Sequence, residues 1–428
     1  MTAYEIDNRA YAPDDAELPA ALKRAHDGGM RPLCLCRPSS AKLPMVIEHR
    51  NAPIEAAPGR GANGSELFIL RRMPGRGHEH APSCKHYEAP EGLSGRAPHL
   101  GGAIRTDDDG AHHSLRLAFP LSHKQKAAAL DEGGRSSDPI KIRKRFARLS
   151  LPGFMHHVLE TAGLNTMHKG LHGKRSWNVM RGRILETMRT QATTRYRDLA
   201  AYSFAPRIFS LQHKDELFRD WRSIERKART GKRSILLFAE LKDIDATQPS
   251  NCQLTFKHLP QRSFALTQPV QKSFLDTLDR ITGLMTGPRG TGHVIACAVI
   301  AVGEGDALSV LDIALTAATP HWIPFGSMAE YRLLSACDEQ GRSYFKSLDY
   351  GQDAALASLV LTDTGDAGTA VFLIDEQPTD AQAGAIRAIE DKGIPVWCWD
   401  IAGGRPALPP RRSHASPSVQ GTPDRPAR

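Results

Sequence analysis

The sequence predicts a mixed α+β protein of several domains, and three observations support this prediction. The chain has 428 residues, 40% of them hydrophobic, which is enough for several cores of about 100–150 residues each. The first hundred residues hold strand-like segments between cysteine-containing loops. The middle is basic and helical, and the last part alternates strand-like with helix-like segments. We expect a β-rich N-terminal domain, a basic helical middle and a mixed α/β C-terminal domain.

Residues 1–100 are expected to form the β-rich domain, together with one helix. Asp14-Asp15 can cap this helix at its start, and Gly28-Gly29 ends it. Two strands follow, at Met45–His49 and Glu66–Arg71, where β-branched and apolar residues lie between turn signals. Two successive strands joined by a loop that is rich in turn residues predict a hairpin.

Composition and periodicity divide the rest of the chain. The expected parts are a polar linker at 101–140, which can include a strand at Ser114–Leu121, a basic helical region at 141–232, an α+β domain at 233–325, an α/β domain at 326–405 and a disordered tail at 406–428. In the helical region, apolar residues recur on one face of two helices, the first around Leu151–Leu159 and the second around Trp177–Met188. The tail is dominated by Pro, Arg and Ser, which cannot bury enough apolar surface to fold.

The compartment is predicted from the N-terminus, the apolar runs and the cysteines. The first residues lack the basic-then-apolar pattern of a secretion signal. The longest apolar run, Val294–Val302, is far shorter than the roughly 20 residues that span a bilayer. Seven cysteines, an odd number in a long chain, do not suggest a disulfide framework. We therefore expect a cytoplasmic protein with no membrane partner.

Two loops carry the residue types that bind zinc. Cys34-Leu-Cys36 presents two thiolates, and His80-Ala-Pro-Ser-Cys84 presents an imidazole and a thiolate. The predicted hairpin between them can bring the loops together, as a tetrahedral structural zinc requires. His78 or His86 can replace His80 as the fourth ligand, and three ordinary loop cysteines are the alternative. Four ligands leave no open position, so a catalytic zinc is not expected.

Several short segments together carry a family resemblance. They are Arg31-Pro-Leu-Cys-Leu-Cys-Arg37, Arg72-Met-Pro-Gly75 through His80 to Cys84, Gly173-Lys-Arg-Ser-Trp177, Lys257-His-Leu-Pro260, Trp322-Ile-Pro324 and Leu361-Thr-Asp-Thr364. The combination resembles the bacterial family catalogued as domain of unknown function 1173. Members are encoded on conjugative plasmids and integrative elements, so the resemblance implies a role around mobile DNA. The family has no established activity, so the resemblance implies no reaction.

A second resemblance concerns residues 326–402, whose expected order of helices and strands is similar to the restriction-endonuclease-like fold. Active members of that fold hold Mg²⁺ with carboxylates and use a lysine beside the attacking water. Here Gln377 stands where the lysine belongs, and Asp363 comes at the end of its strand. We therefore expect a degenerate domain. The alternative is a divergent metal-dependent nuclease that uses Glu330, Asp363 and Asp375, although Glu330 also fits a helix capping box.

The positive charge of the chain is concentrated in one region. Residues 141–233 contain 22 Lys and Arg but only 7 Asp and Glu, whereas the whole chain carries only +9. This pattern favours nucleic acid, and DNA over RNA, as the partner of a non-enzymatic protein. The expected contacts are Lys141, Arg143, Lys144, Arg145, Lys174, Arg175, Arg181 and Arg183. The alternative is a solvated basic surface on a protein-interaction scaffold.

Overall fold

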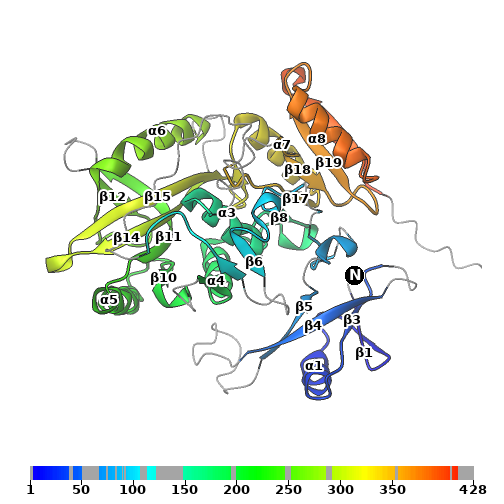
Figure 1. Ribbon diagram of the computed structural model, residues 1–428, viewed down its shortest axis with the longest axis horizontal. Helices are drawn as coiled ribbons and strands as arrows, with labels where there is room; N and C mark the ends of the chain where they lie inside the picture. Colours follow the sequence, from blue (N-terminus) through cyan, green and yellow to red (C-terminus); the bar gives the residue numbers. More distant parts are fainter. Residues whose placement is uncertain are drawn as a thin grey trace, which may run out of the picture.

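The computed structural model has four β-sheets with helices packed around them (Figure 1). It describes residues 3–37, 42–50, 67–73, 76–81, 84–88, 90, 93–106, 113–121, 148–193, 199–245, 252–285, 292–351, 355–404 and 407–412. The predicted mixed α+β class is confirmed.

The N-terminal unit, residues 4–84, has a sheet, a helix and a hydrophobic core of its own. Its strands are β1 (Tyr4–Ile6), β2 (Arg9–Tyr11), β3 (Leu33–Cys34), β4 (Leu43–Arg50) and β5 (Leu67–Arg72), in the order β2-β1-β3-β4-β5. Helix α1 (Leu18–Asp27) packs against β1, β4 and β5. The predicted helix and β4–β5 hairpin are present, although the helix begins later than Asp15, with Pro19 in its first turn, where the missing N–H costs little.

The described residues in the first half of the region expected as a linker, 101–140, are folded, and strand β7 (His113–Leu115) begins close to the strand expected from Ser114. Strands β6 (Ile104–Thr106) and β7 form a three-stranded sheet with β9 (Gln191–Thr193). Phe119 and Leu121 are buried in the same core as these strands. Polar residues separate the buried apolar ones, so the average composition conceals this core. The second half of the expected linker lies outside the described residues.

Five of the seven strands of the third sheet close into a barrel. The barrel strands are β11 (Ile235–Asp245), β12 (Gln253–Phe256), β13 (Phe264–Leu266), β14 (His293–Val302) and β15 (Leu308–Ala318). The short strands β10 (Ser203–Phe204) and β16 (Pro324–Phe325) pair with β11 and β15 at its edge. The ring runs β11-β12-β13-β15-β14 and returns to β11, which pairs with β14 along its first half and with β12 along its second half. Only β13 and β15 are parallel within the ring. Helix α6 (Gln268–Met285) connects β13 to β14.

The helical region packs on this barrel and is not a separate domain. Helices α3 (Leu151–Thr161) and α4 (Trp177–Met188) share a core with one face of the barrel strands, where the rings of Phe154 and Phe238 lie 6.2 Å apart. Helix α5 (Lys214–Gly231) packs on β11 and β14. Three short strands of the region, β8 (Thr166–Met167), β9 and β10 (Ser203–Phe204), each join a different sheet. Strand pairing therefore ties this region to its neighbours.

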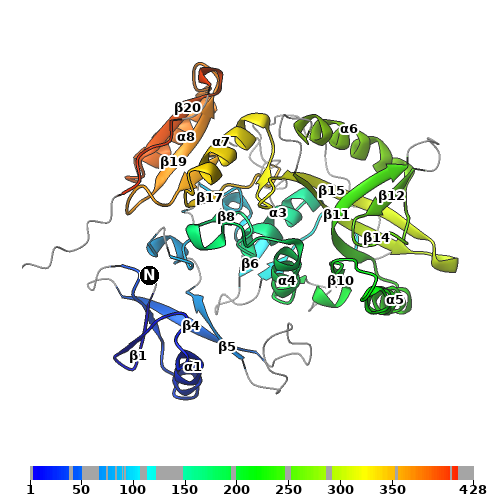
Figure 2. The ribbon, with the colours of Figure 1, turned by 180° about the vertical axis from the view of Figure 1, so that it is seen from behind.

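The fourth sheet has the order β20-β19-β18-β17-β8 (Figure 2). Besides β8, its strands are β17 (Tyr344–Lys346), β18 (Leu359–Leu361), β19 (Thr369–Ile374) and β20 (Val396–Asp400). Helix α7 (Met328–Glu339) precedes β17 in the chain, and helix α8 (Asp380–Glu390) connects β19 to β20. The expected helix, strand, strand, helix and strand are present, and β17 is an additional strand after α7. One buried cluster includes residues of both the barrel and this sheet, so the expected boundary between 325 and 326 does not separate two cores.

The start of the expected disordered tail is ordered. Arg342 donates from Nη1 to the carbonyl oxygen of Pro409 at 2.8 Å, and Leu408 packs against the shared core. The disorder prediction is therefore wrong for residues 407–412, because apolar and backbone contacts hold this segment. Residues 413–428 lie outside the described part of the chain. Among the described residues, no helix combines the length and apolar character needed to cross a bilayer.

Candidate metal centre

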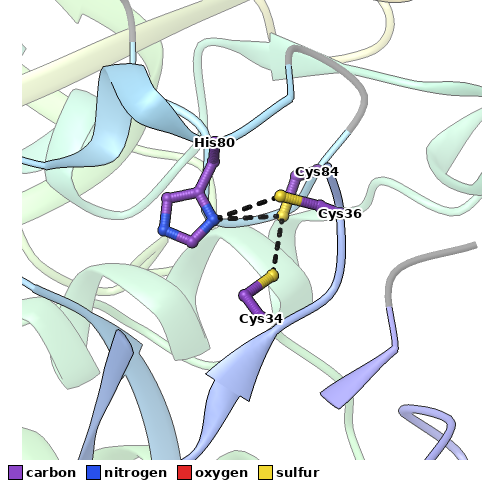
Figure 3. A group of neighbouring side chains, drawn as sticks. All are labelled: Cys34, Cys36, His80 and Cys84. Carbon is purple, nitrogen blue, oxygen red and sulfur yellow. Dashed lines mark hydrogen bonds between the residues drawn. The ribbon is translucent and has the colours of Figure 1, made fainter. Parts of the chain in front are cut away.

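Two loops of the N-terminal unit bring three cysteines and one histidine together (Figure 3). Strand β3 ends at Cys34, and Cys36 follows in the next turn. The β4–β5 hairpin returns the chain to the 3₁₀ turn η1 (Gly77–Glu79), which ends at His80. Cys84 follows, with its N–H bonded to the carbonyl oxygen of Ala81 at 2.8 Å. The hairpin thus does what the sequence predicted, because it places both loops at one end of the sheet.

The distances among the four side chains fit one tetrahedral ion. Cys34 Sγ lies 3.8 Å from Cys84 Sγ, and His80 Nδ1 lies 3.5 Å from Cys36 Sγ and 3.7 Å from Cys84 Sγ. A zinc ion with Zn–S of about 2.3 Å and Zn–N of about 2.0–2.1 Å separates two sulfurs by about 3.8 Å and a sulfur from a nitrogen by about 3.5–3.6 Å. All four ligand atoms lie within 4.8 Å of one another, so the cluster could hold a metal ion.

Burial and backbone donors complete the site. Cys34, His80 and Cys84 are buried, and Cys36 is partly exposed. The N–H of Ala81 points to Cys36 Sγ and the N–H of His86 to Cys84 Sγ, both at 3.4 Å. Such N–H···S contacts suit thiolates, because they stabilise negative charge on sulfur. Thiols and an imidazole this close together, with backbone donors aimed at the sulfurs, are a donor set that could hold a metal ion.

The sulfur atoms influence one another's protonation. The pKa of Cys36 is lowered by hydrogen bonds from the Cys34 and Cys84 thiols. The pKa of Cys34 is raised, first by its hydrogen bonds to the other two thiols and then by burial. The Tyr4 hydroxyl beside them has a raised pKa, because it is buried and faces the sulfur atoms. Three neighbouring sulfurs cannot all carry negative charge without a cation between them.

The two alternative histidines lie differently from His80. His86 Nε2 bonds to the Tyr4 hydroxyl at 2.9 Å, and burial lowers the pKa of His86 to about 3. His78 is exposed on the surface of η1. His80 is therefore the candidate fourth ligand. His86 does not face the cysteines as a ligand but bonds to Tyr4, whose hydroxyl lies beside them.

Arg37 is a supporting residue that the sequence interpretation did not single out. Its Nε donates to the carbonyl oxygen of Glu79 at 2.9 Å, and its Nη2 donates to that of His80 at 3.4 Å. The side chain therefore joins the loop that follows Cys36 to the loop that holds His80. The position of Arg37 directly after Cys36 is the one sequence feature that could have indicated this role.

The three carboxylates of the nuclease alternative do not form a metal site. Glu330 accepts from Lys346 Nζ at 2.7 Å, and its N–H bonds to Ser327 Oγ at 3.1 Å as the capping pattern predicted. Asp363 forms a double hydrogen bond with the Arg342 guanidinium at 2.8 and 2.9 Å. Asp375 is exposed at the end of β19. In the described part of the chain, the cysteine–histidine group is the only cluster with metal-ligand spacing.

The predicted nucleic-acid contacts divide into three groups. Lys141, Arg143, Lys144 and Arg145 lie outside the described residues. Lys174 is exposed, as a phosphate contact requires. The guanidinium groups of Arg175, Arg181 and Arg183 instead donate to backbone carbonyl oxygens, among them Leu164 at 2.6 Å, Ala205 at 2.9 Å and Ala162 at 3.2 Å. These three arginines bind their own fold, because the carbonyl groups that end nearby segments need donors.

Comparison with known proteins gave one match. A family model described as "Protein of unknown function (DUF1173)" matches residues 4–402. No curated protein and no solved structure matches the chain. The comparisons thus support neither the nuclease-like resemblance of residues 326–402 nor an association with mobile DNA.

Proposed function

The chain belongs to the DUF1173 family, and for this member we propose a non-enzymatic, nucleic-acid-associated accessory protein of mobile elements, with one structural zinc ion in its N-terminal unit. The zinc part depends on the Cys34–Cys36–His80–Cys84 geometry, whose ligand distances suit a tetrahedral ion. Four protein ligands leave no place for a water or a substrate. The metal would therefore hold two loops together and would not catalyse a reaction.

The nucleic-acid part depends on the uneven charge of the chain. Residues 141–233 hold 22 basic against 7 acidic residues, so their net charge exceeds that of the whole chain. Such a concentration attracts phosphates, and released counterions make the binding depend on salt. The nuclease alternative lacks comparable support, because Glu330 and Asp363 are already paired with Lys346 and Arg342.

Fluorescence anisotropy with labelled DNA at two salt concentrations tests the proposal. We expect binding at low salt that weakens as salt rises, with a slope of log affinity against log salt of roughly −0.7 to −0.9 for each phosphate contacted. Incubation with Mg²⁺ or Mn²⁺ should leave the DNA intact. Absence of binding to every DNA at low salt would favour the scaffold, and metal-dependent cleavage would favour the nuclease.

A further inference from the structure

A row of arginines follows the outer face of helix α5. Its members are Arg219, Arg222, Arg226, Arg229 and Arg233, at alternating spacings of three and four residues. The first four are exposed and the last is partly exposed. Residues at such spacings lie on one side of a helix, and at a rise of 1.5 Å per residue the four members from Arg219 to Arg229 extend over about 15 Å. Arg233 follows the end of the helix, after Lys232 in the left-handed conformation. We call these five residues the α5 arginine row.

The opposite face of α5 anchors the helix to the barrel. Leu217, Trp221 and Ala228 are buried in the shared core, and the ring of Trp221 lies 5.7 Å from that of Phe264 on β13. This anchoring makes α5 rigid. The four members of the row on the helix, Arg219 to Arg229, are therefore held along one side of α5.

Two of the four acidic residues within α5 are paired with arginines from other segments, and the other two, Asp215 and Glu216 in its first turn, are exposed. Asp220 pairs with Arg207 at 3.0 Å, and Glu225 pairs with Arg262 at 3.2 Å. Among the described residues, Arg219, Arg222 and Arg226 have no hydrogen-bond or ion-pair partner. These three arginines therefore differ from Arg175, Arg181 and Arg183, which donate to backbone carbonyl oxygens.

The barrel beside α5 has the arrangement of an oligonucleotide-binding (OB) barrel. Its strands in chain order form the ring first-second-third-fifth-fourth, with a helix between the third and the fourth, and the long first strand pairs with both the second and the fourth. In such barrels, the second and third strands form the face that binds oligonucleotides. Here those strands are β12 and β13, and the Glu225–Arg262 pair joins α5 to the turn that connects them.

We propose that the α5 arginine row binds the phosphates of single-stranded DNA that passes along the β12–β13 side of the barrel. This inference rests on the proposed nucleic-acid function and adds to it a surface and a form of the ligand. Polar side chains lie at least partly exposed on β12 and just before β13: Gln253 and Thr255 on β12, and Ser263, whose hydroxyl donates to Gln253 Oε1. Such groups can bond to the edges of unpaired bases. A rigid row of guanidinium groups supplies the positive track that single-strand sites need.

Two double variants with equal loss of charge test the surface. Arg222→Gln/Arg226→Gln removes two members of the α5 arginine row, and Lys272→Gln/Arg280→Gln removes two exposed charges from α6 as a control. The probes are a labelled oligothymidine of about 20 nucleotides, longer than the roughly 4–16 that one OB barrel binds, and a duplex of equal length. We expect the α5 variant to bind the single strand at least about tenfold more weakly at 0.1 M salt, with a salt slope reduced by roughly 1.4.

The control variant should bind within about twofold of wild type, since distant exposed charges are largely screened. Both variants should melt like wild type, because all four side chains are exposed. If wild type binds the single strand and the α5 variant binds it equally well, the α5 arginine row is not the binding surface, although the proposed function still stands. Tighter binding of the duplex than of the single strand would contradict the proposal that the ligand is single-stranded DNA. If wild type bound neither probe, the proposed function itself would fail.

Discussion

Cys84 has the most contacts within the candidate metal centre. Its sulfur lies 3.8 Å from Cys34 Sγ and 3.7 Å from His80 Nδ1, and it also receives the N–H of His86. It is buried, so water cannot take the place of a missing ligand without opening the loop. This single side chain therefore connects both halves of the site.

Cys84→Ser should abolish stoichiometric zinc binding. A serine hydroxyl stays protonated at neutral pH and is a poor zinc ligand, whereas thiolate affinity supplies folding energy. Metal content by mass spectrometry of the purified protein measures the effect. Cys398→Ser is the matched control, since Cys398 is an exposed cysteine on β20. Retention of one zinc per chain in the Cys84 variant would rule out this ligand.

Asp363 is an example of a carboxylate whose role is structural. Its partner Arg342 is only 2% exposed and also donates to Pro409 of the C-terminal segment. The N–H of Ser343 bonds to the same carboxylate at 3.0 Å. The residue thus holds the end of β18 against the turn that precedes β17 and the final segment.

Asp363→Ala should lower the free energy of unfolding by about 3 kcal/mol, because it leaves the buried Arg342 guanidinium without its counter-charge. Chemical denaturation monitored by tryptophan fluorescence measures the change. The control is Asp375→Ala, which removes an exposed carboxylate and should shift stability by less than about 0.5 kcal/mol. Equal effects of the two substitutions would contradict the structural role.

At the scale of elements, α5 separates anchoring from surface charge on its two faces. Trp221 is fully buried and lies among aromatic rings, with Phe204 at 5.1 Å and Phe264 at 5.7 Å. Arg222, the next residue, points away from this core and is exposed. The helix can therefore keep its position while its outer charges are changed.

Trp221→Ala should destabilise the protein by about 3–5 kcal/mol, the usual cost of removing a large aromatic side chain from a core. Arg222→Ala should change stability by less than about 0.5 kcal/mol. Thermal melting followed by circular dichroism compares the two. Similar melting temperatures for both variants would mean that α5 is not anchored through this ring.

At the scale of the whole molecule, the N-terminal unit is distinct from the rest. Its buried residues form a cluster that includes Cys34 and Cys84 and none of the barrel strands. Outside this cluster, Glu88 pairs with Arg72 of β5 and with Arg96. Ser94, close to Arg96 in sequence, donates to Glu160 of α3 at 2.6 Å. A short polar network therefore links the unit to the body.

Removal of zinc with a strong chelator should unfold the N-terminal unit alone. Its core is small, so the metal supplies much of its stability. Hydrogen exchange should rise in α1 and in the β4–β5 hairpin, while β14 and β15 of the barrel keep their protection. A uniform rise across the chain, or no change anywhere, would contradict this independence.

The sequence by itself determined the features that depend on local spacing. The three cysteine ligands with a histidine near them, the β4–β5 hairpin and the apolar faces of α3 and α4 follow from short-range patterns, since a turn or a helix face is defined by neighbouring residues. The choice of His80 over His78 and His86 needed the structure. The concentration of positive charge is equally a property of the chain. These predictions did not require knowing which distant segments pack against each other.

Only the tertiary structure decided which segments pair across the chain. The barrel closes because β13 pairs in parallel with β15 and β11 pairs with β14, and no local pattern specifies such partners. The same holds for arginines, since Arg175 and Arg222 are chemically identical but one meets backbone carbonyl groups and the other meets solvent. Periodicity acts within a few residues, whereas pairing and burial depend on which distant surfaces the fold brings into contact.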